Sequence, residues 1–102
     1  HAPSWARLGS ALRHLKRYDE ALECYAQATR IDPNSAWAWN EQGITLEQMG
    51  HLEEALTSYQ RASQAAPRDS LYLYQQADVY TQLGQYTVAL GLLDQPLGAR
   101  EP

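Results

Sequence analysis

Apolar residues recur along this 102-residue chain at intervals of three and four, which is the spacing of one face of an α-helix. The first such stripe runs through Trp5, Leu8, Leu12 and Leu15, and the next begins at Tyr18. The polar break between them is too short for anything but a tight turn between antiparallel helices. Extended along the chain, the pattern predicts helices and no strands. The expected helices span residues 3–15, 18–31, 35–49, 52–65, 70–83 and 86–94.

The same pattern returns every 34 residues, so the chain is an internal repeat. Residues 2–35 and 36–69 share ten identities at this shift. The identical pairs with large or conformationally special side chains are Trp5 and Trp39, Gly9 and Gly43, Tyr25 and Tyr59, and Pro33 and Pro67. A single hairpin cannot bury its own apolar stripe, so the repeats are expected to stack as a solenoid.

One domain is therefore expected, with a first repeat at 2–35, a second at 36–69, a divergent third at 70–94 and a tail at 95–102. Small residues mark the places where the two helices of a hairpin approach closely, and large neighbours fill the gaps that they leave. These small residues are Gly9, Gly43, Ala21, Ala28, Ala55 and Ala62.

Turn residues fall at the predicted helix ends. Gly50 and Gly84 occupy matching points of the second and third repeats, where a left-handed conformation can end a helix. Pro33 and Pro67 close the preceding repeats, because proline cannot continue a helix interior. The polar side chains that follow these prolines predict N-caps for the next helices. They are Asn34, Ser35, Asp69 and Ser70.

The repeated residues resemble the tetratricopeptide repeat family, whose pattern is Trp, Leu-Gly, an aromatic residue or Leu, and later Ala, an aromatic residue, Ala and Pro. The first repeat carries it as Trp5, Leu8, Gly9, Leu12, Ala21, Tyr25, Ala28 and Pro33. The second carries it as Trp39, Gly43, Leu46, Ala55, Tyr59, Ala62 and Pro67, with Gln42 in place of Leu. This resemblance covers residues 2 to about 94. It implies an all-α fold, a right-handed α-solenoid of antiparallel helical hairpins.

The third repeat departs from the pattern. Leu73 stands for Trp, Gln76-Ala77 for Leu-Gly, and Leu93 for the aromatic residue. Pro96 falls where the last small residue belongs, so the final helix is expected to end near Asp94. A truncated last repeat predicts a partly exposed edge that could serve as an interface. Its apolar residues are Tyr86, Leu90 and Leu93.

The resemblance also implies a concave wall, formed by the first helix of each hairpin, in which a partner peptide lies. The positions of this chain that match it are Pro3, Ala6, Ser10, Arg13, Trp37, Asn40, Ile44, Glu47, Leu71, Tyr74, Asp78 and Thr81. Asn40 offers both a donor and an acceptor to a peptide backbone, although an exposed helix Asn can equally bind water. Trp37 and Tyr74 offer flat contact area, or else they pack between repeats.

One subtype of the family clamps the acidic C-termini of heat-shock chaperones with Lys, Asn and Arg side chains. At those places the present chain has Ala6, Ser10, Glu41, Leu71 and Gln75, which predicts that it is not a clamp. With Arg13 at one end and Glu47 and Asp78 further along, the expected groove has mixed charge.

The overall charge and the single cysteine narrow the function further. A net charge of −4, from 8 basic and 12 acidic residues, argues against a nucleic-acid partner. Cys24 is alone, which favours a reducing compartment and predicts a cytoplasmic protein. No apolar run approaches the ~20 residues of a membrane span. The first residue is His1 rather than Met, so we expect the chain to be part of a longer protein.

Catalysis and cofactors are not expected. His14, His51 and Cys24 show no metal-ligand spacing, and Asp19-Glu20 and Glu53-Glu54 complement the positive ends of helices. The predicted function is therefore a non-enzymatic protein–protein interaction scaffold without metal or cofactor, binding a peptide or protein segment in the concave groove. The alternative is a structural or self-association module, within a longer solenoid or attached to a catalytic domain.

Overall fold

The computed structural model describes residues 4–94, which form α-helices and no strands within that range. The helices are α1 (Trp5–His14), α2 (Tyr18–Ile31), α3 (Ala36–Gln48), α4 (Leu52–Ala65), α5 (Leu71–Gln82) and α6 (Tyr86–Leu93). Every boundary lies within two residues of the predicted one. Pro3, Pro96 and the predicted tail at 95–102 lie outside the described residues.

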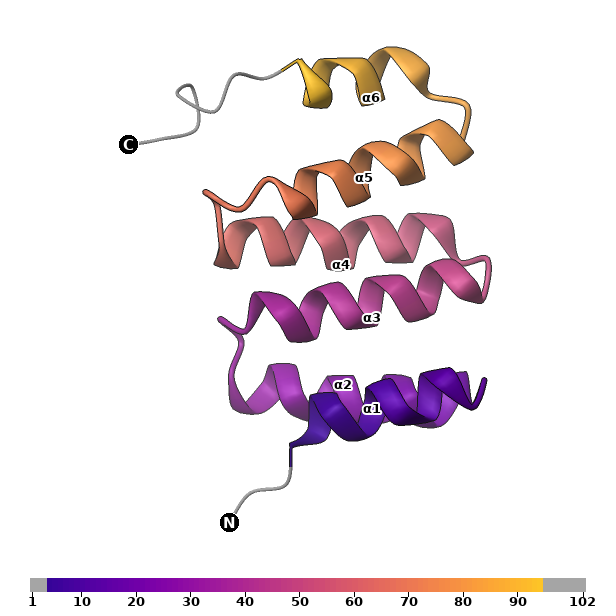
Figure 1. Cartoon of the computed structure of the whole chain (residues 1–102), viewed down its shortest axis with the longest axis vertical. Coiled ribbons are helices and arrows are strands. Elements are labelled where there is room, and N and C mark those ends of the chain that lie inside the picture. The colour runs from indigo at the N-terminus through magenta and orange to yellow at the C-terminus, as the bar shows by residue number, and fades with distance from the viewer. Residues whose placement is uncertain (1–3, 95–102) are drawn as a thin grey trace.

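The helices pair into three antiparallel hairpins that stack in chain order, as Figure 1 shows. Each helix packs mainly against the helices before and after it, and α1 also contacts α3. The hairpin of α1 and α2 lies at one end of the long axis, and α6 lies at the other (Figure 1). The predicted helical solenoid is confirmed.

The three hairpins turn in the same way. The second residue after each first helix has a positive φ, with values of 63° at Lys16, 85° at Gly50 and 79° at Gly84. The next amide then donates to the carbonyl five residues earlier, which ends the helix in a Schellman motif. These bonds are Arg17 to Leu12 at 2.9 Å, His51 to Leu46 at 2.9 Å and Gln85 to Tyr80 at 2.8 Å. The predicted glycine turns are confirmed, and Lys16 adopts the same conformation without glycine.

The two connections between hairpins satisfy the first amides of the following helix in different ways. Ser35 Oγ accepts the amide of Ala38 at 3.3 Å, so it caps α3 as predicted. Ser70 precedes α5 but its side chain makes no capping bond. Instead, Asp69 Oδ1 accepts the amide of Leu71 at 3.0 Å. The aspartate therefore satisfies an amide at this helix start, because Ser70 itself is already in a helical conformation.

The core follows the repeat. Tyr25 and Tyr59 are fully buried, each against the glycine of its own hairpin. A Cβ atom at Gly9 would lie 2.6 Å from Tyr25 Cε1, so the absence of a side chain allows this approach. Two clusters of buried residues lie along the stack. They are Ala6, Ala21, Tyr25 and Ala38 in one, and Leu46, Ala55, Tyr59 and Val79 in the other.

Candidate functional site

The first helices of the hairpins are joined along one face by hydrogen bonds between their side chains. Residues of α1 bond to α3, and residues of α3 bond to α5. We call this the inner face. It comprises Ser10 and Arg13 of α1, Trp37, Asn40, Glu41, Ile44 and Glu47 of α3, and Tyr74, Gln75, Asp78 and Gln82 of α5. Its members include most of the residues that the resemblance placed in the groove.

Between α1 and α3 the inner face holds a largely buried ion pair. Arg13 Nη2 lies 3.2 Å from Glu41 Oε1, and Ser10 Oγ donates to the same carboxylate oxygen. The hydroxyl of Tyr25 donates to Ser10 Oγ at 3.4 Å. Glu41 is buried, and 13% of the Arg13 side chain remains exposed. The charge of Arg13 is thus already compensated within the molecule.

Asn40 lies between hairpins. Its Oδ1 accepts a hydrogen bond from Gln75 Nε2 at 3.3 Å, and the residue is 5% exposed. Little of its amide surface is therefore open to a partner. Asn40 was predicted to contact a peptide, but in the structure its side chain makes a hydrogen bond between hairpins.

A depression of about 300 Å³ opens further along the inner face. Its lining consists of Ile44, Glu47, Gln48, Tyr59, Gln75 and Gln82. The carboxylate of Glu47 accepts the Tyr59 hydroxyl at 2.7 Å and Gln82 Nε2 at 2.6 Å. Burial, and next the bond to Glu47, raise the pKa of Tyr59 well above its usual range. Tyr59 therefore stays a neutral donor, and two neutral groups hold the carboxylate in place.

The other predicted groove residues divide into buried and exposed sets. Ala6 is buried in the first core cluster, so it is unsuited to contact a partner. Trp37 and Tyr74 are 46% and 52% exposed, so they are not packed away between repeats. Leu71, Asp78 and Thr81 are exposed as well. The open aromatic surface of this face therefore lies near the starts of α3 and α5.

The charge of the inner face is acidic rather than mixed. Arg13 is paired with Glu41, whereas Glu47 and Asp78 form no ion pair within residues 4–94. The expectation of mixed charge counted Arg13 but not Glu41, which neutralises it. The uncompensated charges that face solvent here are carboxylates.

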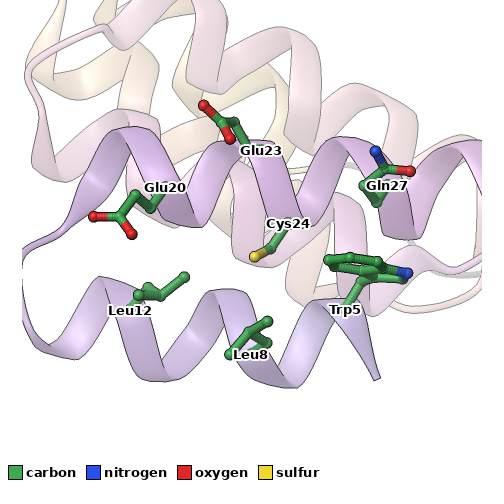
Figure 2. Close-up of a pocket in the computed structure, with 7 residues that line it drawn as sticks. All are labelled: Trp5, Leu8, Leu12, Glu20, Glu23, Cys24 and Gln27. Carbon is green, nitrogen blue, oxygen red and sulfur yellow. The ribbon is translucent and has the colours of Figure 1, made fainter. Parts of the chain in front are cut away.

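A second, more apolar cleft of about 420 Å³ lies between α1 and α2. Its lining comprises Trp5, Leu8, Leu12, Glu20, Glu23, Cys24 and Gln27. Figure 2 shows the apolar side chains of α1 facing Cys24 of α2, with the carboxylates along α2. Burial, and next the nearby Glu23, raise the pKa of the Cys24 thiol. The thiol is thus protonated and poorly nucleophilic at neutral pH.

The matching place in the second hairpin is more polar. Gln42 Nε2 donates to Ser58 Oγ at 3.3 Å, where the first hairpin has Leu8 and Cys24. Arg61 lies 5.6 Å from the ring centre of Trp39, where the first hairpin has Gln27 beside Trp5. The open apolar cleft is therefore not a property of every repeat.

The edge residues Tyr86, Leu90 and Leu93 are all exposed on α6, as the truncated third repeat predicted. Within the described part of the chain there is no group of three or more metal-binding side chains. None of its helices combines the length and the apolar character needed to cross a membrane.

Sequence reasoning missed the residues that connect hairpins. Glu41 and Gln75 entered only as mismatches to the chaperone clamp, and Gln82 was not considered. One signal was available, because Asn40 and Gln75, and Glu47 and Gln82, are both polar pairs separated by 35 residues. Such spacing places two side chains on neighbouring first helices.

Comparisons with known proteins agree on the fold. A sequence model described as tetratricopeptide repeat matches residues 2–68, and a second with the same description matches residues 40–102. MamA of AMB-1 aligns with a TM-score of 0.79 and 22% identity over 87% of this chain and 53% of that one. The chain thus spans about half the length of that protein. No curated protein sequence matches the chain.

A further solved structure is the second repeat domain of Spaghetti (RPAP3) bound to the HSP90 peptide SRMEEVD. It aligns with a TM-score of 0.82 and 20% identity, over 89% of this chain and 84% of that one. At such identities the likeness concerns the fold alone. The predicted all-α repeat solenoid is confirmed by these alignments.

Proposed function

The chain belongs to the tetratricopeptide repeat family, and on that premise we propose that it holds a protein or peptide partner against its inner face. The family fold generally serves protein interaction rather than catalysis. The single observation that carries the proposal is the depression around Glu47, which lies on the same helices as the exposed Trp37 and Tyr74. A binding surface needs open aromatic area beside an oriented polar group.

The charge of the depression favours a partner with a basic side chain. Glu47 is held by Tyr59 and Gln82, which are neutral donors, so its negative charge is oriented but not cancelled. Asp78 adds a second negative charge on α5. A Lys or Arg of an extended peptide would supply the missing cation, while neighbouring apolar residues of the peptide contact Trp37 or Tyr74.

The same charges disfavour an acidic peptide. RPAP3 binds SRMEEVD, whose glutamates and aspartate would face Glu47 and Asp78 here. Like charges opposed across an interface cost binding energy. This supports the proposal that the partner is not a chaperone C-terminus, in agreement with the missing clamp residues.

A displayed-peptide selection against the folded chain tests the proposal. The comparison proteins are Glu47→Gln, which removes the charge, and the double variant Trp37→Ala, Tyr74→Ala, which removes exposed aromatic surface. Selected peptides should be rich in Lys or Arg, and each variant should weaken them by roughly tenfold or more. The peptide SRMEEVD serves as the acidic reference and should bind weakly. Thr57→Ala, at an exposed position of α4, serves as the matched control.

The outcome distinguishes the chemistry of the partner from the location of its binding site. Acidic peptides that bind through Trp37 and Tyr74 would overturn the preference for a basic partner but keep the face. Peptides indifferent to all three substitutions would remove the inner face from consideration. Circular dichroism of each variant should match the parent protein, because the three substituted positions are not in the buried clusters.

Self-association is the second candidate function, because α6 leaves Tyr86, Leu90 and Leu93 exposed at the end of the stack. We also propose a cytoplasmic location, on the basis that Cys24 is the sole cysteine. Fractionation of cells that express the parent protein would test it. Recovery from an oxidising compartment would argue against it.

A further inference from the structure

Both internal junctions between hairpins bury one equivalent position of the following first helix. Thr45 of α3 and Val79 of α5 are equivalent in the repeat, and both are fully buried. Gln76 of α5 is also buried, and its Nε2 donates to Ser63 Oγ of α4 at 2.8 Å. Val79 also belongs to the cluster of Leu46, Ala55 and Tyr59, so both residues of α5 face the preceding hairpin.

The equivalent positions of α1 are open, because no described helix precedes it. Ala11 matches Thr45 and Val79, yet it is exposed. Leu8 matches Gln76 and is 46% exposed, and Leu15 matches Leu83 and is 66% exposed. We call Leu8, Ala11 and Leu15 the leading face. Leu8 also lines the apolar cleft of Figure 2, so the cleft adjoins this face.

The other end of the stack shows the complementary situation. Leu22 of α2 packs against the second core cluster, whose members all belong to later hairpins. Its equivalent in α6 is Leu90, which is 58% exposed. Tyr25 and Tyr59 are fully buried, but their equivalent Leu93 is 50% exposed. We call Tyr86, Leu90 and Leu93 the trailing face.

We propose that two copies of this chain stack head to tail, with the trailing face of one covering the leading face of the next. The contact would repeat the junctions of α2 on α3 and of α4 on α5, with α6 in the role of the preceding helix. Residues 86–93 carry no charge, so α6 adds no like-charge repulsion against Arg7 and Arg13 of α1. The faces differ in sequence, so the contact is heterologous and leaves one free face of each kind.

Sedimentation velocity over a range of concentrations tests this with the full 102-residue chain. Leu15→Glu places a charge on the leading face, and Leu90→Glu places one on the trailing face. Because both positions are exposed, both variants should fold. Each alone should associate roughly tenfold more weakly or worse, since an unpaired charge would be buried. Leu71→Glu, at a position 47% exposed on α5, is the control and should associate like the parent.

Mixing the two variants gives the decisive measurement. The Leu15→Glu protein keeps an intact trailing face, and the Leu90→Glu protein keeps an intact leading face. An equimolar mixture should therefore form a one-to-one complex of twice the monomer mass and no larger species. If circular dichroism shows that either of these variants is misfolded, Tyr86→Lys and Ala11→Glu form a second pair for the same experiment.

Three results would overturn the proposal. The first is a parent protein that stays monomeric at all concentrations. The second is association that Leu90→Glu abolishes and Leu15→Glu does not, which indicates two α6 helices in a symmetric contact. The third is a mixture that remains monomeric although the parent associates. The inner face takes no part in the contact, so peptide binding is measured separately and either proposal can fail alone.

Discussion

Gly43 and Tyr59 share a space that a methyl group would fill. A Cβ atom at Gly43 would lie 2.5 Å from Cε1 and 2.7 Å from Cδ1 of the fully buried Tyr59 ring. Gly9 and Tyr25 repeat the relationship in the first hairpin. In the third hairpin the equivalent residues are Ala77 and Leu93, so the side chain appears where the ring is missing. The two positions change together because they occupy one volume.

Gly43→Ala is therefore expected to destabilise the fold by about 1–3 kcal/mol, since the ring is held on all sides and must shift. Urea unfolding followed by circular dichroism measures the loss. Tyr59→Leu should make the alanine tolerable, so the double variant should lose less than the two single losses added together.

Gly91→Ala is the matched control for this prediction. Gly91 lies in α6, and a Cβ atom there would meet no atom within 4 Å. The same substitution should then stabilise by up to about 1 kcal/mol, because alanine favours the helix. Equal effects at positions 43 and 91 would contradict the steric explanation.

Lys16→Gly is expected to stabilise the first hairpin. Lys16 has φ of 63°, a conformation that costs a residue with a side chain about 1–2 kcal/mol. Glycine removes this strain but loses more entropy on folding, so the net gain should be about 0.5–1 kcal/mol. The urea midpoint should rise accordingly. Gly50→Lys, at the equivalent turn, should lower it, and a neutral result at both turns would contradict the argument.

Removing Glu41 should show how much an unpaired, mostly buried charge lowers the stability of the fold. Glu41→Ala leaves Arg13 mostly buried without its carboxylate, which is expected to cost about 2–3 kcal/mol. The double variant Arg13→Met, Glu41→Leu should be considerably more stable than Glu41→Ala, because neither charge remains. Thermal and urea unfolding of the full double-mutant cycle measure the coupling.

The exposed pair of Arg17 and Glu20 is the control for the buried pair. Its atoms lie 2.6 Å apart, yet both side chains are more than half exposed. Glu20→Ala should change stability by an amount near the error of the measurement. A loss as large as that of Glu41→Ala would show that burial is not the determining factor.

Tyr59 should make the fold sensitive to alkaline pH. Its folded-state pKa is raised, first by burial and then by the bond to Glu47, above the value of about 10 in an unfolded chain. The stabilising contribution is thus fully present below about pH 10 and is lost as the pH rises further, because the unfolded chain then releases its proton first. Urea midpoints should fall between about pH 9 and pH 11.

Tyr59→Phe should reduce this fall but not abolish it, because burial also raises the pKa of Tyr72. Tyr74→Phe, at an exposed position, controls for the loss of a hydroxyl as such. If Tyr59→Phe has the same alkaline dependence as the parent protein, the assignment to Tyr59 is wrong.

The binding candidates were only partly predictable. The helical period predicted that Asn40, Trp37 and Tyr74 lie on the same face of the first helices. Their positions along the backbone agree with this prediction. It did not reveal that Asn40 is covered by Gln75, whereas Trp37 and Tyr74 stay open. The burial of a residue on this face depends on side chains of the next hairpin, about 35 residues later in the chain. The helical period does not show how far those side chains extend.

The sequence by itself determined the helices, their turns and their stacking order. With a period of 34 residues and glycine at the turns, the apolar stripes are buried when the hairpins stack in chain order. This order follows from local residue spacing alone. The tertiary structure decided which charges remain uncompensated at the surface. Glu41 neutralises Arg13 across two hairpins, while Glu47 is left with neutral donors. Electrostatic compensation depends on distances of a few ångströms between residues far apart in the chain, and those distances exist only once the hairpins are packed.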